Sequence, residues 1–259
     1  MRFLFTRRWV LFALAVGLMA WGATALGQWQ FHRLHDKKAE NTLVAGNLDQ
    51  PPVPIDLLLS PGKEPSGANE WRKVVAHGTW DDAHTIVLKY QTREGGPGVD
   101  VVTPLRTADG TGVLVDRGWL QTDNVGSQRP RLPAATRGPV TVIGWIRVDA
   151  TGRAARVDDL ATRAISSVEA AKAIGYPFYG GFLDLHTESP TPATTLGATE
   201  LPDDTSNGPH FFYGLQWWFF AALAVFGFGY LAYDEYRMAQ GRREDQVGSE
   251  GAEHPAVHG

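Results

Sequence analysis

Hydrophobic residues are concentrated in two long uncharged stretches, one near each end of the chain, with about 180 residues of mixed composition between them. The stretches cover residues 9–31 and 211–233. Each has the roughly 20 apolar residues that an α-helix needs to cross a membrane, and a helix satisfies its backbone hydrogen bonds internally. The pattern predicts two transmembrane helices that flank a domain covering residues 32–210.

Basic residues outside the two predicted spans indicate the orientation. Arg2, Arg7 and Arg8 precede the first span, and Arg237, Arg242 and Arg243 follow the second. Arginine and lysine near a span are retained on the cytoplasmic side, whereas a long loop translocates largely regardless of its charge. We therefore expect residues 1–8 and 234–259 in the cytoplasm of a bacterial cell and the domain on the outer side of the cell membrane. The tail has a composition typical of disorder.

The N-terminal segment has an alternative interpretation as a cleaved signal peptide, because Arg7, Arg8, an apolar run and a small-residue site at 23–25 follow each other. However, the apolar run exceeds the roughly 7 to 15 residues of a signal core. Helix-forming residues also continue from Gln28 to Leu48, up to the prolines that begin at Pro51. We expect a retained helix that projects from the membrane.

The middle of the chain shows the alternating pattern of β-strands with one buried face. The predicted strands cover residues 72–80, 85–91, 99–106, 112–119, 139–148 and 178–186. Turns are predicted at Gly95-Gly96-Pro97-Gly98 and at Ala108-Asp109-Gly110, and a helix over residues 157–174 that ends at Gly175. The fold class is therefore α+β: a mainly antiparallel sheet or partly closed barrel, with one or two helices.

Composition excludes several classes of function. The net charge of -4 gives no reason to expect nucleic acid as a partner. Because the chain has no cysteine, it has no disulfide, thiolate nucleophile or cysteine-ligated metal site. Motifs of serine hydrolases, zinc proteases and nucleotide-binding enzymes are absent. The adjacent pairs Asp81-Asp82 and Asp158-Asp159 point in different directions on a strand or helix and make poor acid-base dyads. We expect a protein that is not an enzyme.

Three histidines lie where the predicted spans meet the outer membrane surface. His32 and His35 follow the first span and His210 precedes the second, so packing of the spans would bring them to one depth. Imidazole is a good axial ligand for haem iron, and Arg33 could pair with haem propionates. The alternative is that these residues, together with Trp29 and Trp217, only mark the headgroup zone.

Gln216 lies inside the second predicted span, where an amide without a partner costs free energy. On a helix it shares a face with Tyr213, Trp217 and His210. This face is expected to contact the first span or another protein. Small residues from Ala221 to Gly229 would allow close approach of the helices.

Four segments, in this order, resemble the Surfeit-locus family of cytochrome c oxidase assembly proteins. They are Leu26-Gly27-Gln28-Trp29-Gln30 with Arg33 and Lys37; the strand ending Gly78-Thr79-Trp80; Val101-Val102-Thr103-Pro104-Leu105 followed by Val113-Leu114-Val115-Asp116-Arg117-Gly118-Trp119; and His210 with Tyr213, Gln216 and Trp217. The resemblance covers nearly the whole chain. The chain differs from its relatives in having Pro209 directly before His210.

The resemblance implies which residues bind partners or a cofactor. His210 is a candidate ligand of haem a and Arg33 a candidate propionate partner. Candidate contacts with a partner protein are Trp29, Gln30, Arg117, Trp119, Tyr213, Gln216 and Trp217. Arg117 has a second interpretation as one half of a buried ion pair, and Gly78 and Gly118 have one as positions where the backbone needs freedom.

The resemblance further implies a non-catalytic assembly factor that helps the catalytic subunit of a haem-copper oxidase to acquire or keep haem a. The expected partners are that subunit, membrane lipid and the machinery of haem a synthesis. Two alternatives are a stable accessory subunit of the respiratory oxidase and a membrane-tethered ligand-binding domain.

Overall fold

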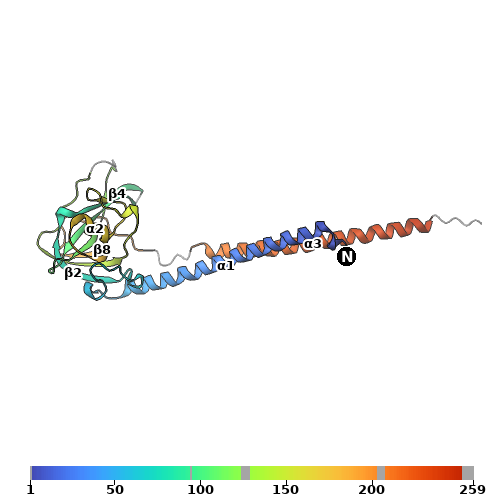
Figure 1. Ribbon diagram of the computed structural model, residues 1–259, viewed down its shortest axis with the longest axis horizontal. Coiled ribbons are helices and arrows are strands. Elements are labelled where there is room, and N and C mark those ends of the chain that lie inside the picture. Colours follow the sequence, from blue (N-terminus) through green and yellow to red (C-terminus); the bar gives the residue numbers. More distant parts are fainter. Residues whose placement is uncertain (1, 94, 124–128, 203–207, 253–259) are drawn as a thin grey trace, which may run out of the picture. The chain divides into compact units, whose positions relative to one another are not determined.

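The chain forms two structural units in the computed structural model, which describes residues 2–93, 95–123, 129–202 and 208–252 (Figure 1). One unit consists of residues 1–40 and 205–259 and contains two long helices; the other, residues 41–204, contains the sheet. The fold is α+β, as the sequence predicts.

The two long helices are α1, Arg7–Asp49, which follows the short 3-10 helix η1 at Arg2–Phe5, and α3, His210–Ala252. Both contain a segment long and apolar enough to cross a membrane. α1 continues as a polar helix beyond its apolar part and ends before Pro51, as predicted, because proline cannot continue the hydrogen bonding of a helix. Pro209 directly precedes α3, and its carbonyl accepts the backbone N–H of Tyr213 at 3.1 Å.

The prediction of a disordered tail from residue 234 is wrong as far as Ala252, because α3 continues to that residue. Arginine, glutamate, glutamine and alanine in this segment are good helix formers. They also extend a helix that is already nucleated by the apolar part, which removes the initiation cost. Residues 253–259 of the predicted tail lie outside the described residues.

The sheet has eight strands in the order β1-β2-β6-β8-β5-β4-β3-β7. Their bounds are β1 Val53–Pro54, β2 Lys73–Trp80, β3 Ile86–Arg93, β4 Gly96–Arg106, β5 Gly112–Gln121, β6 Pro139–Arg147, β7 Ala161–Thr162 and β8 Phe178–Ser189. The predicted strands are confirmed, although β4 already begins inside the turn predicted at 95–98, because Gly96 pairs with Arg93.

Pairing is mainly antiparallel, as predicted, but the sheet is mixed. β8 lies between β5 and β6, parallel to β5 and antiparallel to β6. β1 is parallel to β2, and β7 is parallel to β3. β8 follows a connection of about 30 residues after β6, and long connections of this kind allow a strand to enter between two earlier ones.

The sheet closes on itself between β2 and β4. Thr79 pairs with Arg106 and Trp80 with Leu105, while the rest of β2 pairs with β6. A Cβ at Gly78 would lie 2.3 Å from the carbonyl oxygen of Arg106. Only glycine allows the two backbones to approach this closely, which supports the structural interpretation of Gly78. Of the two predicted alternatives, an open sheet or a partly closed barrel, the pairing of β2 with β4 favours the barrel.

The predicted helix over residues 157–174 is wrong in its first half. Helix α2 covers only Ser167–Ile174, with the hydroxyl of Ser166 as its N-cap and Gly175 (φ +93°) as its C-cap. Asp159 and Leu160 adopt positive φ values of 46° and 50° in a turn. This turn leads into β7. The hydrogen bonds of β7 with β3 hold residues 161 and 162 as a strand, so the helix predicted from the local pattern does not form there.

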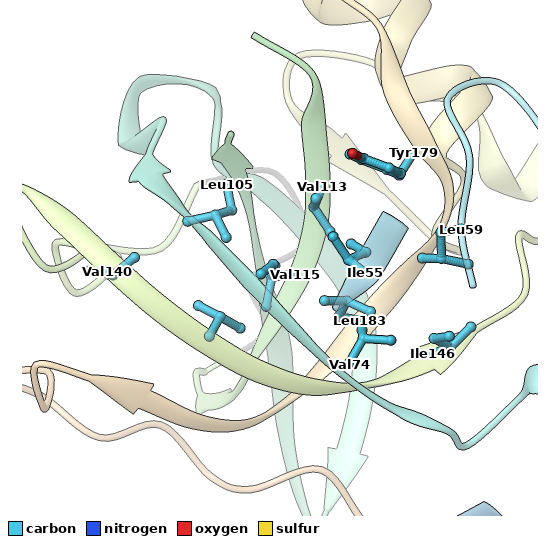
Figure 2. Close-up of a cluster of buried hydrophobic side chains, with 12 residues drawn as sticks. Ile55, Leu59, Val74, Leu105, Val113, Val115, Val140, Ile146, Tyr179 and Leu183 are labelled. Carbon is cyan, nitrogen blue, oxygen red and sulfur yellow. The ribbon is translucent and has the colours of Figure 1, made fainter. Parts of the chain in front are cut away.

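The barrel encloses a core of aliphatic side chains, which Figure 2 shows converging from the surrounding strands. Its buried members are Ile55, Leu59, Val74, Ala76, Leu105, Val113, Val115, Val140, Val142, Ile146, Tyr179 and Leu183. On the outer face, Leu114 and Phe178 pack with Ala170 of α2 in a second cluster. Val113 and Val115 thus face one core and Leu114 the other, as the twofold alternation of a strand requires.

Three buried carboxyl groups lie on neighbouring strands of the barrel: Asp100 on β4, Asp116 on β5 and Asp184 on β8. Asp100 lies 2.9 Å from Nη2 of Arg93, and Asp184 lies 2.8 Å from Nη1 of Arg147. Among the residues that the structure describes, no arginine pairs with Asp116; its Oδ1 accepts the backbone N–H of Gly118 at 2.9 Å.

Burial raises the pKa of all three carboxyl groups. The pKa of Asp100 rises to about 6 because burial outweighs the attraction of Arg93. The pKa of Asp116 lies well above its usual value because of burial and the nearby charges of Asp100 and Asp184. The pKa of Asp184 is also raised by burial, against the opposing effect of Arg147.

We expect Asp116→Asn to stabilise the domain at pH 8 by roughly 1 to 3 kcal/mol. The folded state holds a proton on Asp116 more tightly than the unfolded chain. The stabilisation from this tighter proton binding is therefore present below pH 4 and is lost as the pH rises through the folded-state pKa of Asp116. The asparagine side chain does not ionise, so the variant avoids this loss of stability, and its amide oxygen still accepts the Gly118 N–H. Thermal unfolding measured from pH 4 to pH 8 checks this, and the difference between variant and wild type should vanish toward pH 4.

Asp109→Asn is the matched control, because hydrogen bonds from Thr107 and Thr111 lower the pKa of the Asp109 carboxyl group. A lowered pKa stabilises the folded state above the unfolded-state pKa. This variant should be less stable than the wild type at pH 8. If both variants were more stable than the wild type at pH 8, the stabilisation by Asp116→Asn could not be assigned to the buried carboxyl groups.

Candidate functional site

Helices α1 and α3 pack against each other in opposite directions. Trp9 near the start of α1 contacts Phe228 of α3, with ring centroids 5.8 Å apart, whereas Phe31 further along α1 contacts Trp218 at 5.0 Å. The contact positions recur every three or four residues: Ala23, Gly27 and Gln30 on α1, and His210, Gly214, Trp217 and Ala221 on α3. This spacing is typical of two helices packed side by side at a small angle.

Two glycines allow this close packing. A Cβ at Gly27 would lie 2.3 Å from Cδ1 of Trp218, and a Cβ at Gly214 would lie 2.8 Å from Cε2 of Phe31. Each glycine therefore leaves room for an aromatic ring of the other helix. Small residues serve this purpose in membrane helices, where close packing drives helix association. At Gly227 and Gly229, which the sequence also suggested as contact positions, a Cβ would meet no other atom within 4 Å.

His210 and Gln30 form a hydrogen bond between the two helices. Nδ1 of His210 lies 2.8 Å from Oε1 of Gln30. Because an amide oxygen only accepts hydrogen bonds, Nδ1 donates its proton to this bond. The other ring nitrogen, Nε2, then carries the lone pair when the imidazole is neutral. A hydrogen bond of this kind at one nitrogen is the usual way in which proteins orient a histidine that binds a metal through the other.

An apolar groove runs along the helix pair, with a volume of about 580 Å³. It is lined by Met19, Gly22, Ala23, Leu26, Trp217, Phe220, Leu223 and Ala224. Leu26 precedes Gln30 by four residues, and Trp217 follows His210 by seven, so the groove begins one or two helical turns from the hydrogen bond and on the same helix faces. The polar junction and the groove are therefore neighbours.

The other candidate residues of the helix pair are exposed. Trp29 is 54% and Tyr213 48% exposed, and the side chains of Arg33 and Gln216 are also exposed. Within the described part of the chain, Gln216 has no hydrogen-bonding partner, whereas Trp217 is partly buried at the groove. The structure places these residues along the sides of the helix pair, where another molecule can reach them.

His32 forms a hydrogen bond within its own helix. Its Nδ1 lies 2.8 Å from the backbone carbonyl oxygen of Gln28, one turn earlier in the same helix. The structure thus brings Gln30, and not His32, into contact with His210. The family resemblance assigned Gln30 to a contact with a partner protein. Its bond to His210 could not be predicted, because this bond depends on how each helix is rotated about its axis, and no sequence pattern specifies that rotation.

Arg117 lies in the sheet domain and is only 5% exposed. Its guanidinium approaches the carbonyl oxygens of Pro133 and Ala134 at 3.4 and 3.5 Å, and it lies 5.6 Å above the ring of Trp80. Burial lowers its pKa, while the charges of Glu188 and Asp82 act in the opposite direction. Among the described residues no carboxylate lies within 4 Å, so Arg117 holds a backbone segment in place of forming the suggested ion pair.

Gly118 and Trp119 attach the segment around Gly197 to strand β5. The backbone groups of Trp119 and Gly197 exchange two hydrogen bonds of 2.8 Å. Gly118 has φ +125°, and a Cβ there would lie 2.4 Å from the carbonyl oxygen of Gly197. Nε1 of Trp119 donates to the carbonyl of Gln91 at 3.3 Å, and the ring covers Gly98. The positive φ and the close contact both require glycine, which supports the interpretation of Gly118 as a position where the backbone needs freedom.

The candidate residues thus form two groups. One group lies on the helix pair and includes His210 and Gln30; the other lies on β5 and consists of Arg117, Gly118 and Trp119. Sequence reasoning missed the role of Gly27 and Gly214 as contact points, although glycine inside a long helix is itself a signal of close packing. Among the residues that the structure describes, no cluster of histidine and acidic side chains has the arrangement of a metal site.

These features define a class: a protein with two helices able to span a membrane, one at each end, and a mixed, closed sheet between them. Residues 18–222 match the SURF1 family, and the chain belongs to this family. It is 30% identical over 254 residues to uncharacterized SURF1-like proteins of Mycobacterium tuberculosis and Mycobacterium bovis, which covers 95% of this chain and 90% of each relative. A SURF1-like protein of Dictyostelium discoideum is 31% identical over 104 residues, 38% of each chain.

Proposed function

We propose that this protein is a non-catalytic assembly factor for a haem-copper cytochrome c oxidase, and that it assists haem a insertion or stabilises the catalytic subunit during maturation. The SURF1 family is generally linked to cytochrome oxidase assembly. The observation that carries the proposal is the hydrogen bond between His210 and Gln30, which orients an imidazole beside an apolar groove.

The proposal places the protein in the bacterial cell membrane, with both termini in the cytoplasm and residues 41–204 outside. The two apolar helices and the basic residues at their outer ends support this topology. In this topology the junction at His210 lies at the outer surface of the membrane, where an integral subunit of the oxidase can reach it.

The topology predicts which sites a membrane-impermeant maleimide reaches in intact cells. The chain has no cysteine, so single substitutions give an unambiguous readout. We expect Thr151→Cys, at an exposed position of the domain, to react in intact spheroplasts, because it lies outside the membrane. Gln240→Cys, at the far end of α3, should react only after lysis. The reverse pattern would show that the domain is cytoplasmic.

Haem a fits the helix pair as a cargo. Nε2 of His210 offers a lone pair for iron, the groove offers apolar walls for the macrocycle, and the exposed Arg33 is a cation for the propionates. In this role the chain holds and orients the haem, and the haem supplies its redox chemistry only in the finished oxidase. Gln30 acts as a positioning residue because it keeps the proton of His210 on Nδ1.

The assembly function predicts the phenotype of a strain that lacks the gene. Reduced-minus-oxidised spectra of its membranes should show a weaker a-type oxidase band, because fewer catalytic subunits mature. Expression of the wild-type protein should restore the band. A normal band in the deletion strain would contradict the assembly function, whether or not the protein binds haem.

The haem hypothesis predicts that His210→Ala loses the haem absorbance that the wild type retains after purification from cells making haem a. Gln30→Leu should lower haem occupancy several-fold, because replacing a group that hydrogen-bonds to a metal ligand typically lowers metal affinity by about 10- to 100-fold. His32→Ala is the matched control: it also removes an imidazole near the membrane surface, but one that bonds to its own helix. Absence of haem from the wild type would reject the cofactor and leave the assembly function intact.

The tautomer provides a measurement that does not depend on haem. In the haem-free wild type, the nitrogen chemical shifts of His210 should show a proton on Nδ1 and a lone pair on Nε2. In Gln30→Leu they should show a mixture of tautomers. An unchanged pattern in this variant would show that Gln30 does not position the ring.

A further inference from the structure

One part of the sheet domain is unusually rich in arginine. Between residues 129 and 163 the chain has seven arginines, no lysine and only three acidic residues, although the whole protein is acidic. Arginine differs from lysine in its planar guanidinium, which binds a carboxylate through two parallel hydrogen bonds. The composition of this segment therefore favours recognition of anions that accept two hydrogen bonds, such as carboxylates and phosphates.

The fold brings arginines of this segment to one edge of the sheet. Arg129 donates to the carbonyl oxygens of Leu160 and Thr85, at 3.1 and 2.5 Å. The backbone N–H of Arg163 donates to the carbonyl of Ala154, at 3.1 Å. Ala154 belongs to the short 3-10 helix η5, Arg153–Ala155, which Arg156 follows directly. We call Arg129, Arg153, Arg156 and Arg163, together with Tyr90, the arginine face.

Most of the cations on this face have no internal counterion. Arg147 of the same segment is only partly exposed and is paired with Glu70 and Asp184. In contrast, the exposed Arg153, Arg156 and Arg163 have no carboxylate within 4 Å among the residues that the structure describes. Asp158 and Asp159 lie close in sequence, but neither forms an ion pair with these arginines. The face thus presents unpaired positive charge to solvent.

An aromatic side chain stands among these arginines. Tyr90 is 52% exposed, and the guanidinium carbon of Arg163 lies 5.1 Å from the centre of its ring. Tyr90 has φ +66°, at a bulge where the pairing of β3 with β4 shifts register. A bulky residue rarely adopts this conformation, and such strain is found preferentially at functional sites. Asp159 and Leu160, in the turn before β7, also have positive φ.

We propose that the arginine face binds an acidic protein surface, and specifically carboxylates of the oxidase catalytic subunit; this inference rests on the proposed assembly function. Arginine and tyrosine are the residue types that dominate binding energy at protein interfaces. A lipid surface is a poorer match, because the negative surface potential of membranes is associated with the cytoplasmic leaflet. The face is a second contact, separate in the chain from the residues around His210.

The test is co-purification of the full-length protein with a tagged oxidase catalytic subunit in detergent. We expect Arg153→Glu/Arg163→Glu to reduce the recovered complex at least tenfold at low salt, because two attractive charges become repulsive. The wild-type complex should weaken as salt is raised from about 50 to 300 mM, since exposed charges are screened over about a Debye length. Arg153→Gln/Arg163→Gln should give an intermediate loss.

The matched control is Lys63→Glu/Lys172→Glu, which changes the net charge of the same domain by the same amount at exposed positions outside the arginine face. It should retain the complex. Thermal unfolding of each variant shows whether it is folded. If Arg153→Glu/Arg163→Glu recovered as much complex as the wild type, the proposed role of the arginine face would be wrong. The wild-type complex would still support the assembly function. Failure of the wild type to co-purify would overturn both.

A second measurement tests lipid headgroups as the alternative source of anions. Binding of the solubilised protein to mixed micelles that contain phosphatidylglycerol is measured for the wild type and for Arg153→Glu/Arg163→Glu. We expect the two proteins to bind these micelles equally. A loss of micelle binding in the variant, with oxidase recovery unchanged, would assign the face to lipid headgroups and reject the proposal.

Discussion

Closure of the sheet between β2 and β4 is the constraint on which the domain depends. The chain has no disulfide, so burial of side chains inside the barrel must hold it together. Two backbone pairs join β4 to the end of β2, and they form only because Gly78 lets the strand approach Arg106 without an intervening side chain. This closure surrounds the aliphatic core and pairs the C-terminal ends of β2 and β4, which would otherwise be open edges.

The helix pair uses the same physical device in different surroundings. Gly27 and Gly214 remove side chains at the points where α1 and α3 approach, and the rings of Trp218 and Phe31 fill the space. In a membrane, helices gain little from burying apolar surface, so such packing and hydrogen bonds between helices fix their arrangement. The bond between His210 and Gln30 adds a directional contact that sets which faces meet.

Sequence patterns predicted the elements whose signal is local. The apolar stretches, the prolines after α1 and the alternation of strands β2 to β6 all depend on neighbouring residues, and the structure has them nearly where expected. The first half of the helix predicted at 157–174 does not form, because pairing with β3 holds residues 161 and 162 in a strand and the residues before them in a turn. The composition of the tail alone does not indicate its helical part, because the helix that precedes it provides the nucleus.

The candidate site could be predicted only in part, for the same reason. Resemblance to a family singled out His210, Gln30 and Arg117, but it did not show that the first two bond to each other or that the third faces backbone carbonyls. Buried charges such as Asp116 also gave no signal, because an aspartate in an alternating strand looks like a surface residue until the neighbouring strands are known.

The hydrogen bond between His210 and Gln30 joins residues 180 positions apart. A ribosome makes the chain from its N-terminus, so the first helix and the entire barrel precede His210 in translation. Until then, Gln30 of α1 has no partner in α3. The junction can therefore form only after the whole barrel has been synthesised, and every chain truncated before His210 lacks it.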